Sequence, residues 1–228
     1  MSEIILIETS TSLLSVGLCE DGRLADYREC AVPRSQASMT VPLIEEMLSS
    51  HGMRVGDCDA VCVSSGPGSY TGLRVGSSTA KGLCFGAGLP LIAVPTLDIL
   101  VAQALEAGLP EGCRYIIPMI DARRMEVYSA VYSSEGRRLG EVRPVIVDGN
   151  SFSDERAAGC CVLIGDGAAK CEGVLSGDVR IVPTCPKASA MASLAQAAYD
   201  EKRFENTAYF EPFYLKEFVA TKSSKQLF

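Results

Sequence analysis

Two acidic residues stand at corresponding places in the two halves of this sequence. Glu8 follows the apolar run 4–7 and precedes a hydroxyl-rich turn, and Asp121 follows the apolar run 115–120 and precedes a second turn. In nucleotide-binding proteins, carboxylates and turn N–H groups at strand ends hold phosphate and Mg²⁺. If the two halves face each other, a nucleotide cleft is expected between them. Its candidate residues are Glu8, Ser10, Ser12, Asp121 and Asp166.

Asp166 has a simpler interpretation as well. It stands between Gly165 and Gly167, just before a helical pattern that begins at Ala168. This spacing is typical of a turn and a helix cap. The sequence favours that structural role for Asp166 over a role in phosphate or metal binding.

The sequence gives little support for a metal site or for a Ser/His/Asp catalytic site. His51 is the one histidine, and the ten cysteines include no CxxC pair. A zinc site needs ligands at metal spacing, and a Ser/His/Asp set needs a suitably placed histidine. No metal site and no peptidase activity are therefore expected, and the cysteines are expected to be reduced thiols.

The glycine-rich stretch 66–88 combines a turn with an unusual helix. Gly66 and Pro67 open it with turn chemistry, and a helix is expected over Thr71 to Gly88. Each glycine inside a helix costs about 1 kcal/mol relative to alanine, so several of them need a compensating gain. Small residues recur at i, i+4 and leave one face almost without side chains: Gly72, Gly76, Ala80, Cys84 and Gly88. We interpret this face as one against which a partner helix lies.

A second helix, expected over Ser35 to Ser50, carries an apolar stripe. Met39, Leu43 and Met47 recur with helical period, and Pro42 should bend the helix or mark its first turn. The simpler interpretation is a helix that covers a sheet. The alternative is that the stripe is apolar surface for a partner, for which methionine is well suited.

The order of the elements predicts a duplicated α/β fold. Residues 1–108 read β-β-β-α-β-α-β-α, and the pattern restarts in residues 109–228. A duplicated ββ(β)αβα unit with an acid at each first turn is the layout of the actin, sugar-kinase and Hsp70 ATPase superfold (ASKHA, RNase H-like). The expected strands are 4–7, 15–19, 23–29, 60–63, 91–94, 115–120, 126–132, 162–164 and 179–182, and the remaining helices are 97–107, 151–156, one from 168, and 188–202.

Composition limits the partners. The net charge of −7 argues against a general nucleic-acid-binding surface. No apolar run reaches the roughly 18 residues of a membrane span, and the first residues lack the basic segment of a signal peptide. A cytoplasmic protein without membrane contact is expected.

Four segments resemble the bacterial TsaB (YeaZ) family, in the same order and over nearly the whole chain. They are ILIETSTSLLSVGL from residue 5, SSGPGSYTGLRVG from residue 64, IDARRMEVY from residue 120, and EPFYLK from residue 211. The resemblance implies a subunit of the machinery that makes threonylcarbamoyladenosine on tRNA. It implies binding to the catalytic paralogue TsaD and, with ATP, to TsaE.

The sequence departs from the catalytic relative in two ways. The HxxxH metal pair of that relative has no counterpart in the helix over 35–50, and Glu8 stands where the family mostly has Asp. The peptidase activity once attached to the family through its "glycoprotease" label is not expected for this chain.

Three hypotheses remain from the sequence. The first is a non-catalytic scaffold that binds TsaD and forms a homodimer in isolation, with an interface made of Met39, Leu43, Met47, Gly72, Gly76, Ala80 and Leu83. Met47→Glu or Gly76→Arg would then break the complex without unfolding the chain. The second is a nucleotide-using enzyme of the sugar-kinase type. The third is direct tRNA contact through Arg123, Arg124 and the lysines at 216, 222 and 225, which the acidic net charge limits to a supporting role at most.

Overall fold

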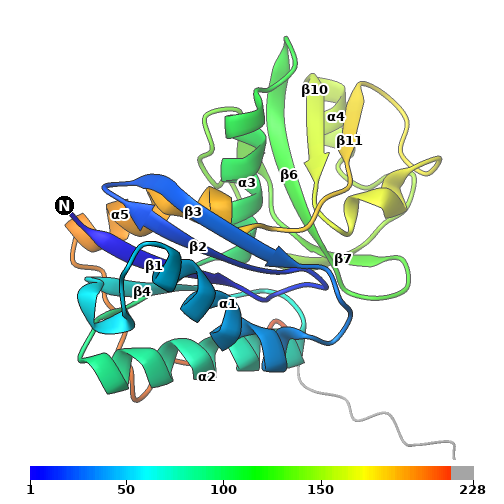
Figure 1. The fold of residues 1–228 in the computed structure, drawn as a ribbon. Coiled ribbons are helices and arrows are strands. Elements are labelled where there is room, and N and C mark those ends of the chain that lie inside the picture. Colours follow the sequence, from blue (N-terminus) through cyan, green and yellow to red (C-terminus); the bar gives the residue numbers. More distant parts are fainter. Residues whose placement is uncertain (217–228) are drawn as a thin grey trace, which may run out of the picture.

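Two β-sheets lie on either side of one helix in the computed structural model, which describes residues 1–216 (Figure 1). The strand order is β3-β2-β1-β4-β5 in the first sheet and β11-β10-β6-β7-β9 in the second, where β8 also pairs with β6. The first sheet consists of β1 (Glu3–Glu8), β2 (Leu14–Glu20), β3 (Arg23–Cys30), β4 (Ala60–Ser64) and β5 (Leu91–Val94). The second consists of β6 (Cys113–Asp121), β7 (Glu126–Ser129), β8 (Tyr132–Ser133), β9 (Arg143–Ile146), β10 (Cys160–Ile164) and β11 (Val179–Val182).

The helices connect and cover these sheets. The α-helices are α1 (Gln36–Ser50), α2 (Tyr70–Ala87), α3 (Thr96–Ala107), α4 (Ser153–Ala158) and α5 (Ala192–Asp200). Residues 1–216 also contain three short 3-10 helices, which are η1 (Val55–Asp57), η2 (Ala168–Cys171) and η3 (Ala188–Met191). No helix within residues 1–216 is long and apolar enough to cross a bilayer.

The two sheets repeat one topology, which confirms the duplicated α/β fold. The first strand of each half pairs antiparallel with the strand that follows it and parallel with a later one: β1 with β2 and β4, and β6 with β7 and β10. The outer pairs correspond too, because β4–β5 and β10–β11 are both parallel. Glu8 and Asp121 are the last residues of the equivalent strands β1 and β6.

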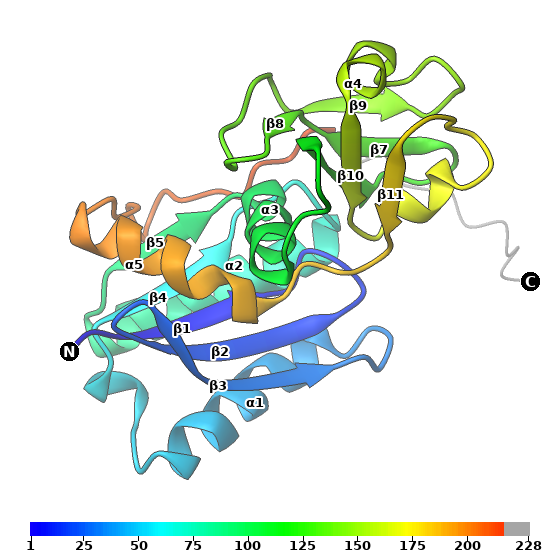
Figure 2. The ribbon, with the colours of Figure 1, turned by 90° about the horizontal axis from the view of Figure 1, so that it is seen from above.

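Burial on both faces explains why β1 reads as a continuous apolar run. Ile5 and Ile7 point to one side of the sheet, where they pack with α1 and α2. Ile4 and Leu6 point to the other side, where they pack with α3, η3 and α5. Figure 2 shows α5 and α3 along one side of the first sheet and α1 along the other.

The second sheet differs from the prediction in two places. The strand expected over residues 126–132 is interrupted after Ser129, and β8 pairs with β6 separately. Strand β9 was not predicted at all. It is an edge strand whose side chains are mostly exposed and which contains Pro144, so it shows no apolar alternation.

The C-terminal part of the chain returns to the first sheet. Ala188, Ala195 and Ala198 pack in the same core as Ile4 and Leu6. The helix expected over 188–202 starts as the 3-10 turn η3 and becomes α5 at Ala192. A boundary near residue 108 therefore divides the sequence repeat, whereas in space the first sheet also carries α5 and the segment that follows it.

Candidate functional site

A cleft of about 1270 Å³ lies between the two halves, where β1 and β6 end. The turn after β1 contributes Ser10, Thr11 and Ser12 to its lining, and the turn after β6 contributes residues 121–126. The N-terminus of α2, the β3–α1 connection and residues 214–216 line other sides of the cleft. Strand ends at a meeting of two such halves are a common place for a ligand site.

Four of the five predicted cleft residues meet there, and one does not. Ser10, Ser12, Asp121 and Asp166 line the cleft. Glu8 has no exposed surface and lies behind the turn that it precedes. A nucleotide role for these residues stays a prediction, because their position shows only that they could face a common ligand.

Glu8 is a buried acid with incomplete hydrogen bonding. Its Oε1 accepts a hydrogen bond from the backbone N–H of Ser10 at 2.5 Å, and its Oε2 has no partner among residues 1–216. Burial raises the pKa of Glu8 to about 7, and the nearby charge of Asp166 acts in the same direction. The hydroxyls of Ser10 and Ser64 are also buried and unpaired in this part of the chain. Glu8 is therefore held as a neutral acid over much of the pH range below 7.

Asp121 and Asp166 are joined to each other and to a lysine. The backbone N–H of Asp121 donates to Asp166 Oδ1 at 2.9 Å. Asp121 Oδ1 accepts from Lys170 Nζ at 2.8 Å and from the N–H of Arg123 at 2.6 Å. Burial raises the pKa of Asp166 to about 6. Asp166 lies in a turn as predicted. Its side chain accepts a hydrogen bond from the last residue of β6 and does not cap a helix.

A divalent cation of the kind used by ATPases of this fold does not fit these residues. Lys170 already neutralises Asp121, and Glu8 cannot reach the cleft. No group of three His, Cys, Asp or Glu side chains within residues 1–216 is arranged to hold a metal. The carboxylates at the ends of β1 and β6 instead form hydrogen bonds and an ion pair within the protein.

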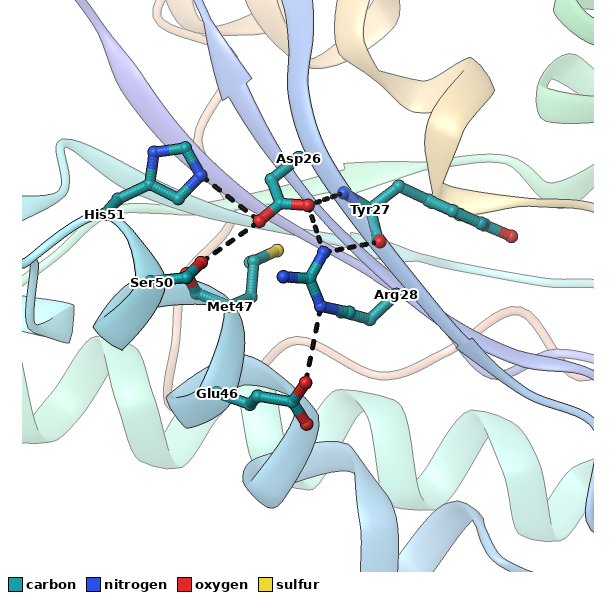
Figure 3. Close-up of polar contacts among 7 residues, drawn as sticks. All are labelled: Asp26, Tyr27, Arg28, Glu46, Met47, Ser50 and His51. Carbon is teal, nitrogen blue, oxygen red and sulfur yellow. Dashed lines mark hydrogen bonds and ion pairs between the residues drawn. The ribbon is translucent and has the colours of Figure 1, made fainter.

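His51 is engaged on the far end of α1. Its Nε2 lies 3.2 Å from Asp26 Oδ2, and Arg28 bridges Asp26 and Glu46, as Figure 3 shows. Partial burial would raise the pKa of Asp26, yet hydrogen bonds from the Tyr27 N–H, Arg28 and His51 hold it below its ordinary value. This network ties α1 to β3.

Two of the four glycines of α2, Gly72 and Gly76, pack inside the chain, which corrects the interpretation that this part of the helix face is empty. A Cβ added at Gly72 would lie 2.0 Å from the carbonyl oxygen of Thr9, and one at Gly76 would lie 2.3 Å from the Thr9 hydroxyl oxygen. Thr9 Oγ1 also donates to the Gly72 carbonyl at 2.8 Å. Without side chains at these positions, α2 approaches β1 closely enough to hold the turn that lines the cleft.

The apolar stripe of α1 is likewise part of the core. Met47 has no exposed surface and Leu43 is 8% exposed, and both pack with β1 and β2. Met39 and Leu83 are only partly buried against the same core, whereas Ala80 is fully buried. The simpler interpretation of this helix, a cover for the sheet, describes these contacts. Of the seven residues predicted for a partner interface, only Met39 and Leu83 keep appreciable surface.

The cleft mouth carries basic and aromatic residues that the sequence did not single out as a group. Arg34, Arg123 and Arg124 line it, and all three have left-handed backbone conformations, with φ of 63°, 70° and 47°. Arg34 comes from the β3–α1 connection and Tyr214 from the segment that follows α5. Because these segments are far apart in sequence, only the fold brings them together. Lys222 and Lys225, predicted to extend this basic surface, lie outside the described residues.

Comparison with known proteins gives consistent results. The family model described as "TsaD: tRNA N6-adenosine threonylcarbamoyltransferase" matches residues 32–156. The Escherichia coli protein named tRNA threonylcarbamoyladenosine biosynthesis protein TsaB is 31% identical, over 96% of either chain. The Haemophilus influenzae protein of the same name is 32% identical, over 96% of this chain and 95% of its own length.

Solved structures agree with the sequence matches. YeaZ from Pseudomonas aeruginosa superimposes with a TM-score of 0.82 at 27% identity, and the match covers 94% of this chain and all of that one. A Clostridium difficile activator of 2-hydroxyisocaproyl-CoA dehydratase, at 12% identity and a TM-score of 0.51, shares the fold over 88% of this chain and 96% of its own. With full-length relatives above 30% identity and a matching fold, the chain belongs to the TsaB (YeaZ) family.

Proposed function

We propose that this chain is a non-catalytic scaffold subunit in the biosynthesis of threonylcarbamoyladenosine on tRNA. It binds a TsaD-type catalytic subunit and, with ATP, a TsaE-type ATPase, and it contacts tRNA only through the assembled complex. Family membership over the whole chain supports the pathway. The internal use of Asp121 and the burial of Glu8 support a role without catalysis by this subunit.

The observation that carries the scaffold proposal is the outward side of α1 and α2, here called the outer helix face. Its exposed residues include a small or apolar set, which is Ala37, Val41, Pro42, Ser78, Gly82, Phe85 and Gly86. Polar and charged residues of the same helices are exposed as well, among them Glu45, Glu46 and Arg74. Phe85 is 88% exposed. A Cβ added at Gly82 or Gly86 would meet nothing within 4 Å, so no packing inside the chain requires glycine there. Glycines that weaken a helix without an internal reason are explained by a partner backbone that approaches closely.

The equivalent helix pair of a paralogue fits this face. Two helix pairs that meet in a bundle bury both apolar faces at once. The same face can close on a second copy of the chain when the partner is absent, since a two-fold contact is self-complementary. The interface thus moves from the buried stripe predicted from the sequence to the opposite side of the same two helices.

Gly82→Arg should weaken the complex with the TsaD-type subunit at least about tenfold, because a long charged side chain would stand inside the contact. The melting temperature of the free chain should stay the same or rise slightly, since arginine is a better helix former than glycine and the site is open. Gel filtration and titration calorimetry with the purified partner measure both effects.

Gly140→Arg is the matched control, because a Cβ at Gly140 also meets nothing and the residue lies in the second half of the chain. Equal binding by both variants would exclude the outer helix face. The substitutions suggested by the sequence, Met47→Glu and Gly76→Arg, would not be informative, because both residues are buried and the chain itself would be destabilised.

The nucleotide-using enzyme remains the alternative, and the observation in its favour is the size and position of the cleft between equivalent strand ends. Hydrolysis of ATP by the purified chain, abolished by Asp121→Ala, would favour this alternative over the scaffold.

A further inference from the structure

The last described residues, Glu211–Lys216, form a strap that is firmly attached to the first half of the molecule. The N–H of Phe213 donates to the carbonyl of Ser65 at 2.7 Å. The backbone contact is close, since a Cβ added at Gly66 would lie 2.7 Å from the Phe213 carbonyl oxygen. Just before the strap, Lys81 of α2 donates to the carbonyls of Ala208 and Phe210, each at 3.1 Å. The path of the strap is therefore set by main-chain contacts.

Beyond Phe213 the strap runs along the cleft and reaches the second half. The ring of Tyr214 packs on that of Tyr70, with centroids 4.9 Å apart, at the N-terminus of α2. Tyr214, Leu215 and Lys216 all line the cleft. Lys216 then forms an ion pair with Glu126, at the start of β7. One short segment thus runs along the cleft from the N-terminus of α2 to the start of β7.

The two attachments differ in strength. On the first half, backbone hydrogen bonds and the Tyr70–Tyr214 contact hold the strap. On the second half the attachment given by the described residues is the ion pair, in which the Lys216 side chain is 47% exposed and that of Glu126 is 20% exposed. Ion pairs open to solvent are weak and sensitive to salt. The contact between Lys216 and Glu126 is therefore the attachment of the strap that breaks more easily.

The halves are joined elsewhere by the segments 108–112 and 183–187, and α3 packs against both sheets. Gly108 and Gly112, in the first of these segments, both have positive φ. These connections keep the two halves joined when the ion pair between Lys216 and Glu126 is broken. The strap can therefore leave the second half without separating the two halves.

We propose that the strap Glu211–Lys216 is a latch, which holds the two halves together across the cleft through Lys216 and Glu126 and releases them when this pair is broken. It controls access to the cleft and is independent of which partner binds the outer helix face.

Hydrogen–deuterium exchange of the full chain tests the latch. Lys216→Glu and Glu126→Lys should each raise exchange about two- to fivefold in the turns 9–13 and 121–126, the range expected from losing one exposed ion pair. The double variant, Lys216→Glu with Glu126→Lys, restores the opposite charges and should return exchange to the wild-type level. Lys202→Glu makes the same charge change away from the cleft and should leave both turns unchanged.

A chemical cross-link gives a second, independent measurement. Carbodiimide should join the Lys216 amine to the Glu126 carboxylate as an amide. The linked chain should show slower exchange in both turns than a Lys216→Gln chain treated in the same way, in which the Lys170–Asp121 pair is still open to the reagent. The latch is wrong if neither single variant raises exchange, if the double variant does not reverse it, or if the link leaves exchange unaltered. No partner protein is needed, so these outcomes are separate from the fate of the scaffold proposal.

Discussion

Gly72→Ala should lower the free energy of unfolding by more than about 3 kcal/mol, the range of severe core overpacking. The added Cβ would lie 2.0 Å from the Thr9 carbonyl oxygen, which belongs to the backbone and cannot rotate away. Helix α2 would have to move off β1, and the Thr9–Gly72 hydrogen bond would be lost with it. Urea unfolding followed by circular dichroism measures the change.

Gly82→Ala in the same helix is the matched control, with an expected effect of the opposite sign. A Cβ there meets nothing within 4 Å, so the higher helix propensity of alanine should raise the free energy of unfolding by about 1 kcal/mol. Gly76→Ala should fall between the two, because its closest neighbour is the Thr9 hydroxyl on a side chain that can turn. Equal and small effects at all three glycines would show that α2 does not depend on close approach to β1.

Glu8→Gln should raise the free energy of unfolding above neutral pH. The variant's free energy of unfolding should also depend less on pH below neutrality than that of the wild type. The folded-state pKa of Glu8 is raised to about 7 from a reference of 4.5. The folded state therefore binds more protons than the unfolded state between these values, and the stability present below pH 4.5 is lost as pH rises through 7. A shift of this size corresponds to about 3 kcal/mol as an upper estimate. Glutamine stays neutral and keeps an oxygen to accept from the Ser10 N–H.

The measurement is unfolding of both proteins at pH 5 and pH 8. From pH 5 to pH 8, the free energy of unfolding of the variant relative to that of the wild type should increase by up to about 3 kcal/mol. Asp166, whose pKa is raised to about 6, contributes in the same direction in both proteins and cancels in the comparison. Ser64→Ala removes a buried hydroxyl that lowers the pKa of Glu8, so it should keep the pH dependence of the wild type and move its midpoint to higher pH. A Glu8→Gln profile parallel to that of the wild type would mean that Glu8 is ionised in the folded protein.

Local patterns predicted the duplicated fold because they reflect burial within single strands. The runs that end at Glu8 and Asp121 are buried on both faces, and such strands appear in sequence as unbroken apolar stretches. Strand β9 shows the limit of this signal. Its pairing with β7 is carried by the backbone, while its side chains are largely exposed and leave no pattern to detect.

The candidate site was harder to predict, because the same residue types serve internal packing and partner binding. Gly72 and Gly82 are both helical glycines, yet one touches Thr9 and the other faces open space. Which side of α2 meets β1 depends on tertiary packing, and periodicity alone gives both sides equal weight. Glu8 was placed with the cleft residues for a similar reason, since its position at a strand end says nothing about the turn that covers it.

Reconstituted tRNA modification tests the scaffold claim most directly. The TsaD-type subunit from the same organism, with its TsaE-type partner, the threonylcarbamoyl donor and ATP, is assayed with and without this chain. We predict that modification requires the chain, that Gly140→Arg supports it fully, and that Gly82→Arg supports it only weakly at protein concentrations near the dissociation constant. Equal modification in the absence of the chain would contradict the account.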